Sequence, residues 1–465
     1  MKNTRFYPLF SIILISFLTS FSVFSAVSVK SNPSLKTTQK SVAKKNAHGF
    51  WVNEEDEALK EATKLKKPIL IDFFGIWCPP CNQLDELVFS QAEFKQAAKK
   101  FVLLKMDADN EKSWVLKSKY NVGGYPTIIM AQVEDHQAGN EIDRIVGYYP
   151  TNVITAKMNE ALNSDGKSNQ EKIMALIKKS IEQADEAQDY KKVISLTQAA
   201  LALEPENLDF KLTQIKAQSH DDKDILKNKT SKKILDDIQS DRKKMPVLTL
   251  VGQFEIQPSK EVLDELLSRV NPSTLYIDND GFTEADIYAM GIDLAEHDGN
   301  TSLKKVYTDM TVESFEKLLK KYGEDSRSLN LSYTYYLQKA GNFKKAQDVY
   351  DRMIAKYPTE FTFYYPAANM AVEMKKFDQA RSYIEKAMEF AYGDNKIRCQ
   401  ERALKVAMAE IKEKKDDTAK VLLKTAIEQS EKFSSEFKKP EGLQVRSANY
   451  IKKLNKTIEE AKTLL

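Results

Sequence analysis

Two cysteines spaced two residues apart constrain this chain more than any other feature of its sequence. Cys78 and Cys81 lie in the stretch Trp-Cys-Pro-Pro-Cys, directly after the apolar run 69–74. A Cys-x-x-Cys pair between a strand and a helix places its first sulfur at the helix N-terminus. Unpaired N–H groups and the helix dipole favour the thiolate there, and the thiolate is the species that attacks disulfides. The spacing therefore predicts a redox site and not a structural cross-link.

Length and charge limit the other possibilities. A chain of 465 residues is too long for one ordinary core, and we expect about three domain-sized units. The 70 Lys and Arg residues nearly balance the 67 Asp and Glu residues, which leaves a net charge of +3. That balance argues against nucleic acid or an anionic membrane surface as the main partner.

The first residues predict export. Lys2 and Arg5 form a positive end, an apolar stretch covers residues 9–24, and small residues follow up to Ala26. This pattern is typical of a secretory signal peptide, here residues 1–26. Polar residues interrupt the stretch, and it falls short of the ~20 apolar residues of a spanning helix, so we favour cleavage near Ala26. An uncleaved inner-membrane anchor is the alternative.

Cysteine usage agrees with a redox role. A secreted domain held together by disulfides would be rich in cysteine, whereas this chain has three. Its one close pair is therefore expected to be catalytic, and disulfides are the substrates available outside the cytoplasm. We expect the third cysteine, Cys399, to pack between helices as a small apolar residue. A further redox role for Cys399 is the alternative.

Apolar spacing divides the rest of the chain into three parts. Residues 27–48 are rich in Lys, Ser, Thr and Asn without apolar periodicity, which predicts a flexible linker. Residues 49–163 alternate between helix and strand patterns, which implies an α/β fold, a sheet with helices on both faces. From residue 164 onward, in what we call the helical half, strand signals nearly vanish and amphipathic helices continue to the end. The expected strands are 69–74, 101–106, 127–130 and 141–146, and the expected helices are 54–66, 78–89, 91–100, 113–120 and 153–162.

A spaced pattern recurs within the helical half. The turn, packing alanine, aromatic and terminal proline of a helix–turn–helix repeat of about 34 residues match Gly341, Phe343, Ala346, Tyr350 and Pro358. The next repeat places Phe377, Ala380 and Ile384 in the same frame. This resembles the tetratricopeptide repeat, and we expect TPR-like repeats over 326–465 and one TPR-like unit, ending at Pro205, within 164–325. Stacked helix pairs form a concave surface, which predicts a binding site for a client or partner protein.

Aromatic residues crowd one part of these repeats. Tyrosines and phenylalanines are unusually frequent between residues 333 and 365. We expect most of these rings to form core between helices. The remainder are expected to line a groove for a peptide or protein ligand.

Residues 50–162 resemble the thioredoxin superfamily. Asp72 lies six residues before Cys78, at the end of the first buried strand, where thioredoxins carry a buried acid, and Lys105 lies where they carry its lysine partner. Tyr125 and Pro126, in Gly-Tyr-Pro-Thr, match the loop that holds a cis-proline. Residues 67–90 look most like the periplasmic C-terminal domain of the transmembrane reductase DsbD. The resemblance covers about a quarter of the chain and implies a thioredoxin fold.

The resemblance also implies roles for the catalytic residues. Cys78 would be the exposed attacking thiolate that forms a mixed disulfide with a substrate, and Cys81 would resolve that intermediate. Asp72 would be a buried carboxyl of raised pKa that accepts the Cys81 proton, with Lys105 moderating the shift. The alternatives are a solvated strand end for Asp72 and an exposed, silent lysine at position 105.

The neighbouring residues have expected roles too. A cis peptide at Pro126 would leave the Tyr125 backbone free to pair with an extended substrate strand, and a plain turn is the alternative. Trp77 is expected to shield the site, or else only to pack. A zinc site built on the cysteine pair would need further ligands, but Cys399 and four scattered histidines are poorly placed to complete it. We therefore expect neither a metal nor a cofactor.

These expectations combine into a functional hypothesis. Pro79 lacks an N–H that would stabilise the Cys78 thiolate, and no histidine lies between the cysteines, so we expect a thiol pKa near or above about 7 and a reducing couple. The sequence thus predicts a periplasmic protein-disulfide reductase acting on client proteins with disulfides, with a DsbD-like membrane electron donor. A helical-repeat scaffold or chaperone with a redox-sensing domain is the alternative, as is a disulfide isomerase or oxidase.

Overall fold

The computed structural model describes residues 44–163, 169–186, 188–277, 280–437 and 445–465. The predicted signal peptide and most of the predicted linker lie outside these residues. Lys45, near the end of that linker, forms an ion pair with Glu61 at 2.6 Å. Within the described ranges, no helix combines the length and the apolar character needed to cross a membrane.

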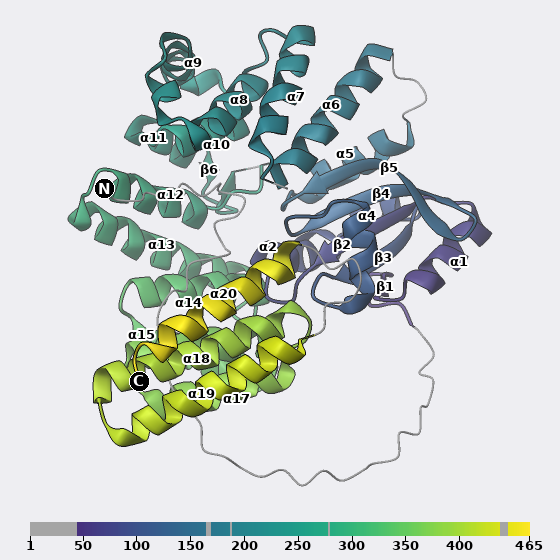
Figure 1. The fold of residues 1–465 in the computed structure, drawn as a ribbon. Coiled ribbons are helices and arrows are strands. Elements are labelled where there is room, and N and C mark those ends of the chain that lie inside the picture. Colours follow the sequence, from purple (N-terminus) through teal and green to yellow (C-terminus); the bar gives the residue numbers. More distant parts are fainter. Residues whose placement is uncertain (1–43, 164–168, 187, 278–279, 438–444) are drawn as a thin grey trace.

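A five-stranded sheet lies at the centre of residues 44–163 (Figure 1). Its strands are β1 (Trp51–Val52), β2 (Ile69–Phe74), β3 (Val102–Asp107), β4 (Thr127–Glu134) and β5 (Gln137–Val146). The spatial order is β1-β3-β2-β4-β5, with β1, β2 and β3 parallel, β4 antiparallel to β2, and β5 antiparallel to β4. β2 is central and buried on both faces, as its continuous apolar run predicts.

Helices cover both faces of this sheet, which confirms the predicted α/β fold (Figure 1). They are α1 (Glu55–Leu65), α2 (Pro79–Gln83), α3 (Ala92–Ala98), α4 (Trp114–Lys119) and α5 (Thr151–Leu162). Alternate residues of β2 point to opposite faces. Leu70 therefore joins the core beneath α3 and α5, while Ile71 and Phe73 join the core beneath α1 and α4.

The hairpin of β4 and β5 is longer than the sequence predicted. Both strands extend towards a turn at Asp135 and His136, whose φ angles of 46° and 61° belong to the left-handed region. Positive φ angles at both turn residues are typical of a two-residue hairpin, because the twist of such a turn matches that of the two strands. The extension carries exposed polar residues such as Gln132 and Glu134, which hid it from an apolar pattern. The short strand β1 was not predicted.

The helical half is helical throughout almost all its described residues. Its helices are α6 (Asn169–Glu186), α7 (Tyr190–Leu203), α8 (Leu208–Asp221), α9 (Lys229–Ser240), α10 (Val247–Ile256), α11 (Lys260–Ser268), α12 (Glu284–His297), α13 (Thr301–Tyr322), α14 (Arg327–Lys339), α15 (Phe343–Lys356), α16 (Phe361–Glu373), α17 (Phe377–Phe390), α18 (Asp394–Lys414), α19 (Asp417–Glu436) and α20 (Val445–Lys462). A two-stranded ribbon, β6 (Val270–Asn271) with β7 (Tyr276–Ile277), interrupts them.

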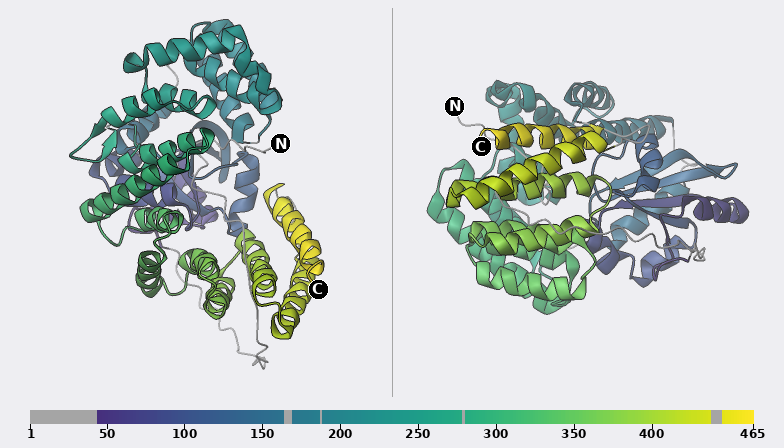
Figure 2. Two further views of the ribbon diagram at one scale, coloured as in Figure 1. Left: turned by 90° about the vertical axis from the view of Figure 1, so that its left-hand side faces the viewer. Right: turned by 60° about the horizontal axis from the view of Figure 1, so that its bottom comes forward.

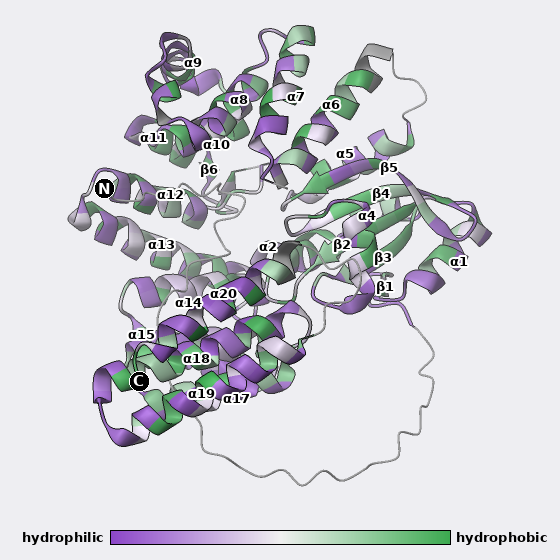
Figure 3. Cartoon of the chain, viewed as in Figure 1, coloured by the Kyte–Doolittle hydropathy of each residue, from purple (hydrophilic) through white to green (hydrophobic). Residues whose placement is uncertain are grey.

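The helices are consistent with helical repeats. Ala346 and Tyr350 on α15, and Ala380 and Ile384 on α17, are almost completely buried, as expected for packing positions of a repeat. Gly341 follows α14 with φ +76°, a conformation that suits a helix-ending glycine. Along the helical half, apolar and polar residues alternate around the helices, whereas the central strand β2 is mostly apolar (Figure 3).

The helical half follows an arc around the sheet-containing part of the chain (Figures 1 and 2). The two parts keep separate apolar cores on either side of the redox loop. α2 of the sheet-containing part lies against α14 of the helical half. The loop that carries the cysteines is therefore enclosed between the two parts.

Candidate redox site

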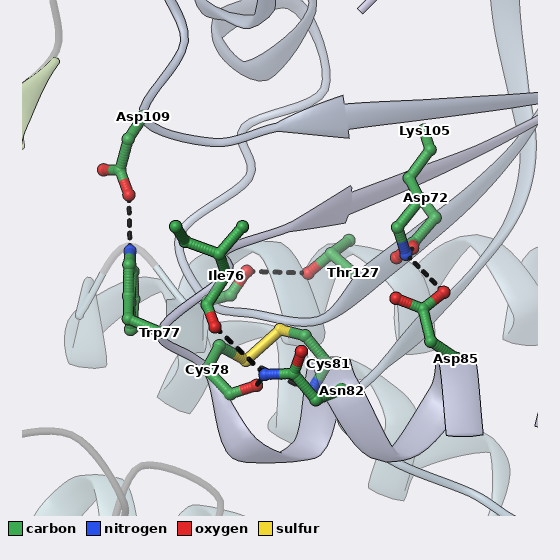
Figure 4. Close-up of a disulfide and its surroundings, with 11 residues drawn as sticks. Asp72, Ile76, Trp77, Cys78, Cys81, Asn82, Asp85, Lys105, Asp109 and Thr127 are labelled. Atoms are coloured by element: carbon green, nitrogen blue, oxygen red, sulfur yellow. Dashed lines mark hydrogen bonds and ion pairs between the residues drawn. A yellow bond between two sulfur atoms is a disulfide. The ribbon is translucent and has the colours of Figure 1, made fainter. Parts of the chain in front are cut away.

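The cysteine pair forms a disulfide at the start of α2 (Figure 4). Cys78 is the N-cap residue of this helix, and its sulfur accepts a hydrogen bond of 3.2 Å from the Cys81 N–H. Pro79 and Pro80 occupy the first two helical positions and carry no N–H. The Asn82 amide donates to the carbonyl oxygen of Cys78 at 2.8 Å, which fixes the loop. The two cysteines are thus brought together as the spacing predicted.

A buried charged group lies on the strands behind the disulfide. Asp72 on β2 and Lys105 on β3 are register partners in the sheet, and Lys105 Nζ lies 2.6 Å from Asp72 Oδ2. Lys105 also contacts Asp85 Oδ1 at 2.9 Å (Figure 4). Asp72 is 0 % exposed and Lys105 is 3 % exposed. The readings of Asp72 as a solvated strand end and of Lys105 as an exposed lysine are therefore wrong.

Burial sets the protonation behaviour of this group. It raises the pKa of the Asp72 carboxyl above its ordinary value, because desolvation disfavours the charged form, and Lys105 offsets part of that rise. For Lys105, burial acts against the charge, but the two carboxylates outweigh it and raise the pKa of the lysine. Oδ1 of Asp72 is buried without a hydrogen-bond partner among the described residues. This oxygen is an available proton acceptor.

Asp85 is the member of this group that sequence reasoning missed. It lies in the π-helical turn Leu84–Val88 that follows α2, and its side chain is 30 % exposed. The signal was its position four residues after Cys81, which places both on one face of a helix. Asp85 links the buried pair to the protein surface.

The loop beside the disulfide also has the predicted shape. The peptide bond between Tyr125 and Pro126 is cis, so the plain-turn reading is wrong. Trp77 precedes Cys78 and donates its indole N–H to Asp109 Oδ2 (Figure 4). Its ring meets the Tyr125 ring edge to face, with centroids 6.1 Å apart.

One expectation about the site is wrong: Cys78 is not exposed. Its exposed fraction is 0 % and that of Cys81 is 1 %. The cause is the helical half, which lies over the cysteine loop. Ile76 and Trp77 pack against an apolar group from α16–α18 and the turn before α18, here called the bridging cluster. Its members are Phe361, Ala368, Ile384, Ala387, Ala391, Cys399 and Ala403.

The bridging cluster also explains part of the aromatic segment. Phe361 belongs to the cluster, and Tyr364 and Tyr365 pack against it together with Trp77. These rings therefore share one apolar cluster with Trp77 of the redox loop. Tyr333, Tyr350 and Phe363 are buried between helices, as expected for core.

Cys399 packs as the sequence predicted. It is a buried free cysteine of the bridging cluster, and burial raises the pKa of its thiol to about 12, although Arg398 and Arg402 act in the opposite direction. Such a thiol is hardly ionised at neutral pH. In the part of the chain that the structure describes, no three His, Cys, Asp or Glu side chains are grouped so as to hold a metal ion.

A sheet of this topology, with a Cys-x-x-Cys disulfide after its central strand and a cis-proline opposite, defines a thioredoxin-like protein. A family model for the thioredoxin-like domain matches residues 55–162. Thioredoxin H5 of Arabidopsis thaliana is 36 % identical over 95 residues, which cover 20 % of this chain and 70 % of that protein. The chain therefore belongs to the thioredoxin-like family, and residues 55–162 are its thioredoxin-like domain.

Proteins named thiol:disulfide interchange protein DsbD are also similar over this domain. The one from Ralstonia nicotianae is 30 % identical over 115 residues, which are 24 % of this chain and 18 % of that protein. The one from Campylobacter jejuni is 29 % identical over 119 residues, which are 25 % of this chain and 20 % of that protein. The chain thus spans about a fifth of the length of these DsbD relatives. The predicted resemblance is confirmed for this domain.

Proposed function

We propose that this chain is an exported thiol-disulfide oxidoreductase that acts mainly as a protein-disulfide reductase. The observation that carries the proposal is the Cys78–Cys81 disulfide at the start of α2, in a domain similar to thioredoxins and to DsbD. Buried Asp72 behind the pair supports it, because a proton acceptor is what a resolving cysteine requires.

The proposed reaction consists of two exchange steps. The Cys78 thiolate attacks one sulfur of a client disulfide, so a mixed disulfide forms and the other client sulfur leaves as a thiolate that takes up a proton. The Cys81 thiolate then attacks Cys78, releases the second client sulfur and leaves the Cys78–Cys81 disulfide. The dithiol gives up two electrons, the client disulfide gains them, and the chain ends oxidised.

Asp72 is proposed to take the proton that Cys81 loses. Its raised pKa makes the carboxylate a stronger base than an ordinary aspartate. Lys105 holds the negative charge in the interior, and half-exposed Asp85 on the other side of that lysine offers a route for the proton to reach solvent.

The start of α2 supports the reducing direction. A helix N-terminus normally aims several N–H groups at the first sulfur, but prolines fill two of those positions here. Within the described residues, one backbone N–H, that of Cys81, donates to the Cys78 sulfur. A thiolate with fewer donors is less stable, which makes the dithiol the stronger reductant.

The partners follow from this chemistry. Client proteins with disulfides would be found outside the cytoplasm, and we propose the periplasm because of the similarity to DsbD and the predicted signal peptide. The oxidised pair has to be reduced again by another dithiol, and a DsbD-like membrane donor is proposed for this step. The helical half would bind the client or another partner protein, and with a net charge of +3 no nucleic-acid partner is proposed.

Reduction of insulin disulfides tests the activity. The full chain should reduce insulin with a dithiol as the electron source, and Cys78→Ser should not. The reduction potential of the pair tests the direction. A value near about −120 mV would contradict a reductase and favour an oxidase.

One observation favours a second candidate, a helical-repeat scaffold or chaperone in which the redox pair only senses oxidation. The disulfide is buried against the helical half, so its state could alter how the two parts fit together. Client binding that persists in Cys78→Ser/Cys81→Ser, together with negligible insulin reduction by the unaltered chain, would support the scaffold.

A further inference from the structure

The residues that cover Cys78 belong to the helical half, whereas the residues of the candidate redox site belong to the thioredoxin-like domain. The thioredoxin-like domain has two apolar cores built within residues 50–162, and α6–α20 have cores of their own. Among the described residues, the bridging cluster is the apolar cluster that joins the two parts, and only Ile76 and Trp77 enter it from the thioredoxin-like domain. Separating the two parts there would leave every other apolar core intact.

A cationic side chain of the helical half lies over the Trp77 ring. The guanidinium of Arg398 lies 5.4 Å from the centre of the Trp77 ring. A cation over an indole face is attracted by the ring quadrupole. Because Trp77 is directly bonded to Cys78 in the chain, this contact holds the helical half over the first sulfur.

A second contact joins Glu86 to the start of α14. Its carboxylate accepts hydrogen bonds from the Ser326 and Ser328 hydroxyls at 2.8 and 2.7 Å and from the Arg327 N–H at 2.8 Å. A carboxylate at a helix N-terminus is stabilised by the unpaired N–H groups and by the dipole. Glu86 lies one to two turns beyond Cys81, so the cap ties the cysteine helix to the helical half.

A third contact lies before α18. The Tyr392 hydroxyl donates to Asp107 Oδ2 at the end of β3. The next residue, Gly393, has φ +53° and packs against the backbone of Asp109, where a Cβ atom would lie 1.7 Å from the Asp109 carbonyl oxygen. No side-chain rotation can relieve such a clash, because both groups are fixed by backbone. This contact therefore requires glycine.

We propose that the helical half is a movable cover over the redox pair, and that it opens at these three contacts to admit another protein. The inference goes beyond the proposed function, because access to the sulfurs is needed whichever way the electrons flow. The contact is partly polar and lies apart from the other apolar cores, and interfaces of that kind between domains allow relative motion. In the closed form the disulfide is shielded from attack, and the open form exposes it.

The experiment measures how fast a small phosphine reduces the Cys78–Cys81 disulfide in the folded full chain. Gly393→Ala should prevent closure, and the rate should rise at least about tenfold, equivalent to about 1.4 kcal/mol in the closing equilibrium. Gly299→Ala is the matched control, since Gly299 also has a positive φ of +66° but a Cβ there meets nothing within 4 Å. The control should react like the unaltered chain.

Two further variants guard against misfolding. Glu86→Ala and Tyr392→Phe each remove one contact without backbone strain, and each should raise the rate by a smaller factor. The proposal is overturned if the folded variants all react at the rate of the unaltered chain. Failure of the proposed function looks different: insulin would stay oxidised even in variants whose disulfide the phosphine reaches quickly.

Discussion

The redox pair lies between two regions whose polar side chains differ in burial and in pairing. On the side of the thioredoxin-like domain, Asp72 and Lys105 are buried and paired with each other inside one domain. On the side of the helical half, the polar contacts of Glu86 and Tyr392 join residues far apart in the chain and lie only partly buried. We propose that the first region supplies the chemistry and that the second controls access. Separate variants should therefore alter one without the other.

The largest expected effect concerns the chemistry. Cys78→Ser should lower insulin reduction to the uncatalysed background, because it removes the proposed attacking sulfur and leaves Cys81 without the partner with which it closes the disulfide. Cys399→Ala is the matched control, since Cys399 is buried with a thiol pKa raised to about 12 by that burial, and it should keep nearly full activity. If Cys399→Ala folds but loses activity, the chemistry depends in part on the helical half. That result would contradict the division between the two regions.

The next effect tests how strongly the interior depends on its ion pair. Lys105→Met should lower the free energy of unfolding by about 3–5 kcal/mol, because it leaves buried Asp72 without its cation. Urea denaturation measures this change as a lower midpoint at similar slope. In contrast, Lys60→Met removes an exposed pair with Glu57 and should leave the midpoint where it was. Equal midpoints for both variants would contradict a buried charge pair at this site.

A smaller effect is expected for the proton acceptor. Asp72→Asn should slow insulin reduction by about 10²-fold, the size of effect typical of general acid–base catalysis. A base acts only when deprotonated, so the unaltered enzyme should speed up as pH rises through the raised pKa of Asp72, and the variant should lose that rise. Asp56→Asn, at an exposed position on α1, is the control. An unchanged pH–rate profile in Asp72→Asn would exclude Asp72 as the base.

The smallest expected effect concerns how stability depends on pH at Asp107, where β3 meets the helical half. Burial raises the pKa of Asp107 to about 6; the charge of Asp109 adds to the rise, while the Tyr392 hydroxyl and Lys117 oppose it. Because the folded value exceeds the ordinary one of about 4, protonation of Asp107 stabilises the folded form. That contribution is complete at pH below about 4 and is lost as pH rises through about 6.

The contribution of Asp107 to the free energy of unfolding should therefore be larger at pH 5 than at pH 7. The free energy of unfolding of the unaltered chain, minus that of Asp107→Asn at the same pH, should decrease from about pH 5 to about pH 7. Taking the difference removes the contribution of the other titrating groups. A difference that stays constant would mean that Asp107 does not titrate over this range in the folded protein.

The sequence predicted the sheet because its central strands have clear apolar patterns. The apolar run 69–74 became β2 with the predicted bounds. The resemblance to thioredoxins suggested the pairing of Asp72 with Lys105, and the structure makes them register partners on adjacent strands. The extended ends of β4 and β5 were missed, since one face of that hairpin is polar and exposed. A pattern based on burial cannot detect a strand that buries little.

The cover was missed for a different reason. Glu86 and Ser326 are separated by 240 positions, and neither carries a local pattern that points to the other. Trp77 and Tyr365 each look like ordinary core or surface aromatic residues in sequence. Only tertiary packing shows that Trp77 and Tyr365 contact the same apolar cluster. The sequence therefore predicted an exposed Cys78, whereas Cys78 is buried.

Capture of partner proteins tests the central claim most directly. In Cys81→Ala the resolving sulfur is absent, so a mixed disulfide at Cys78 should persist. The account predicts adducts of Cys81→Ala with other exported proteins that vanish on reduction and are missing in Cys78→Ser/Cys81→Ala. If Cys81→Ala yields no adduct although its Cys78 reacts readily with an alkylating reagent, this sulfur does not exchange bonds with other proteins.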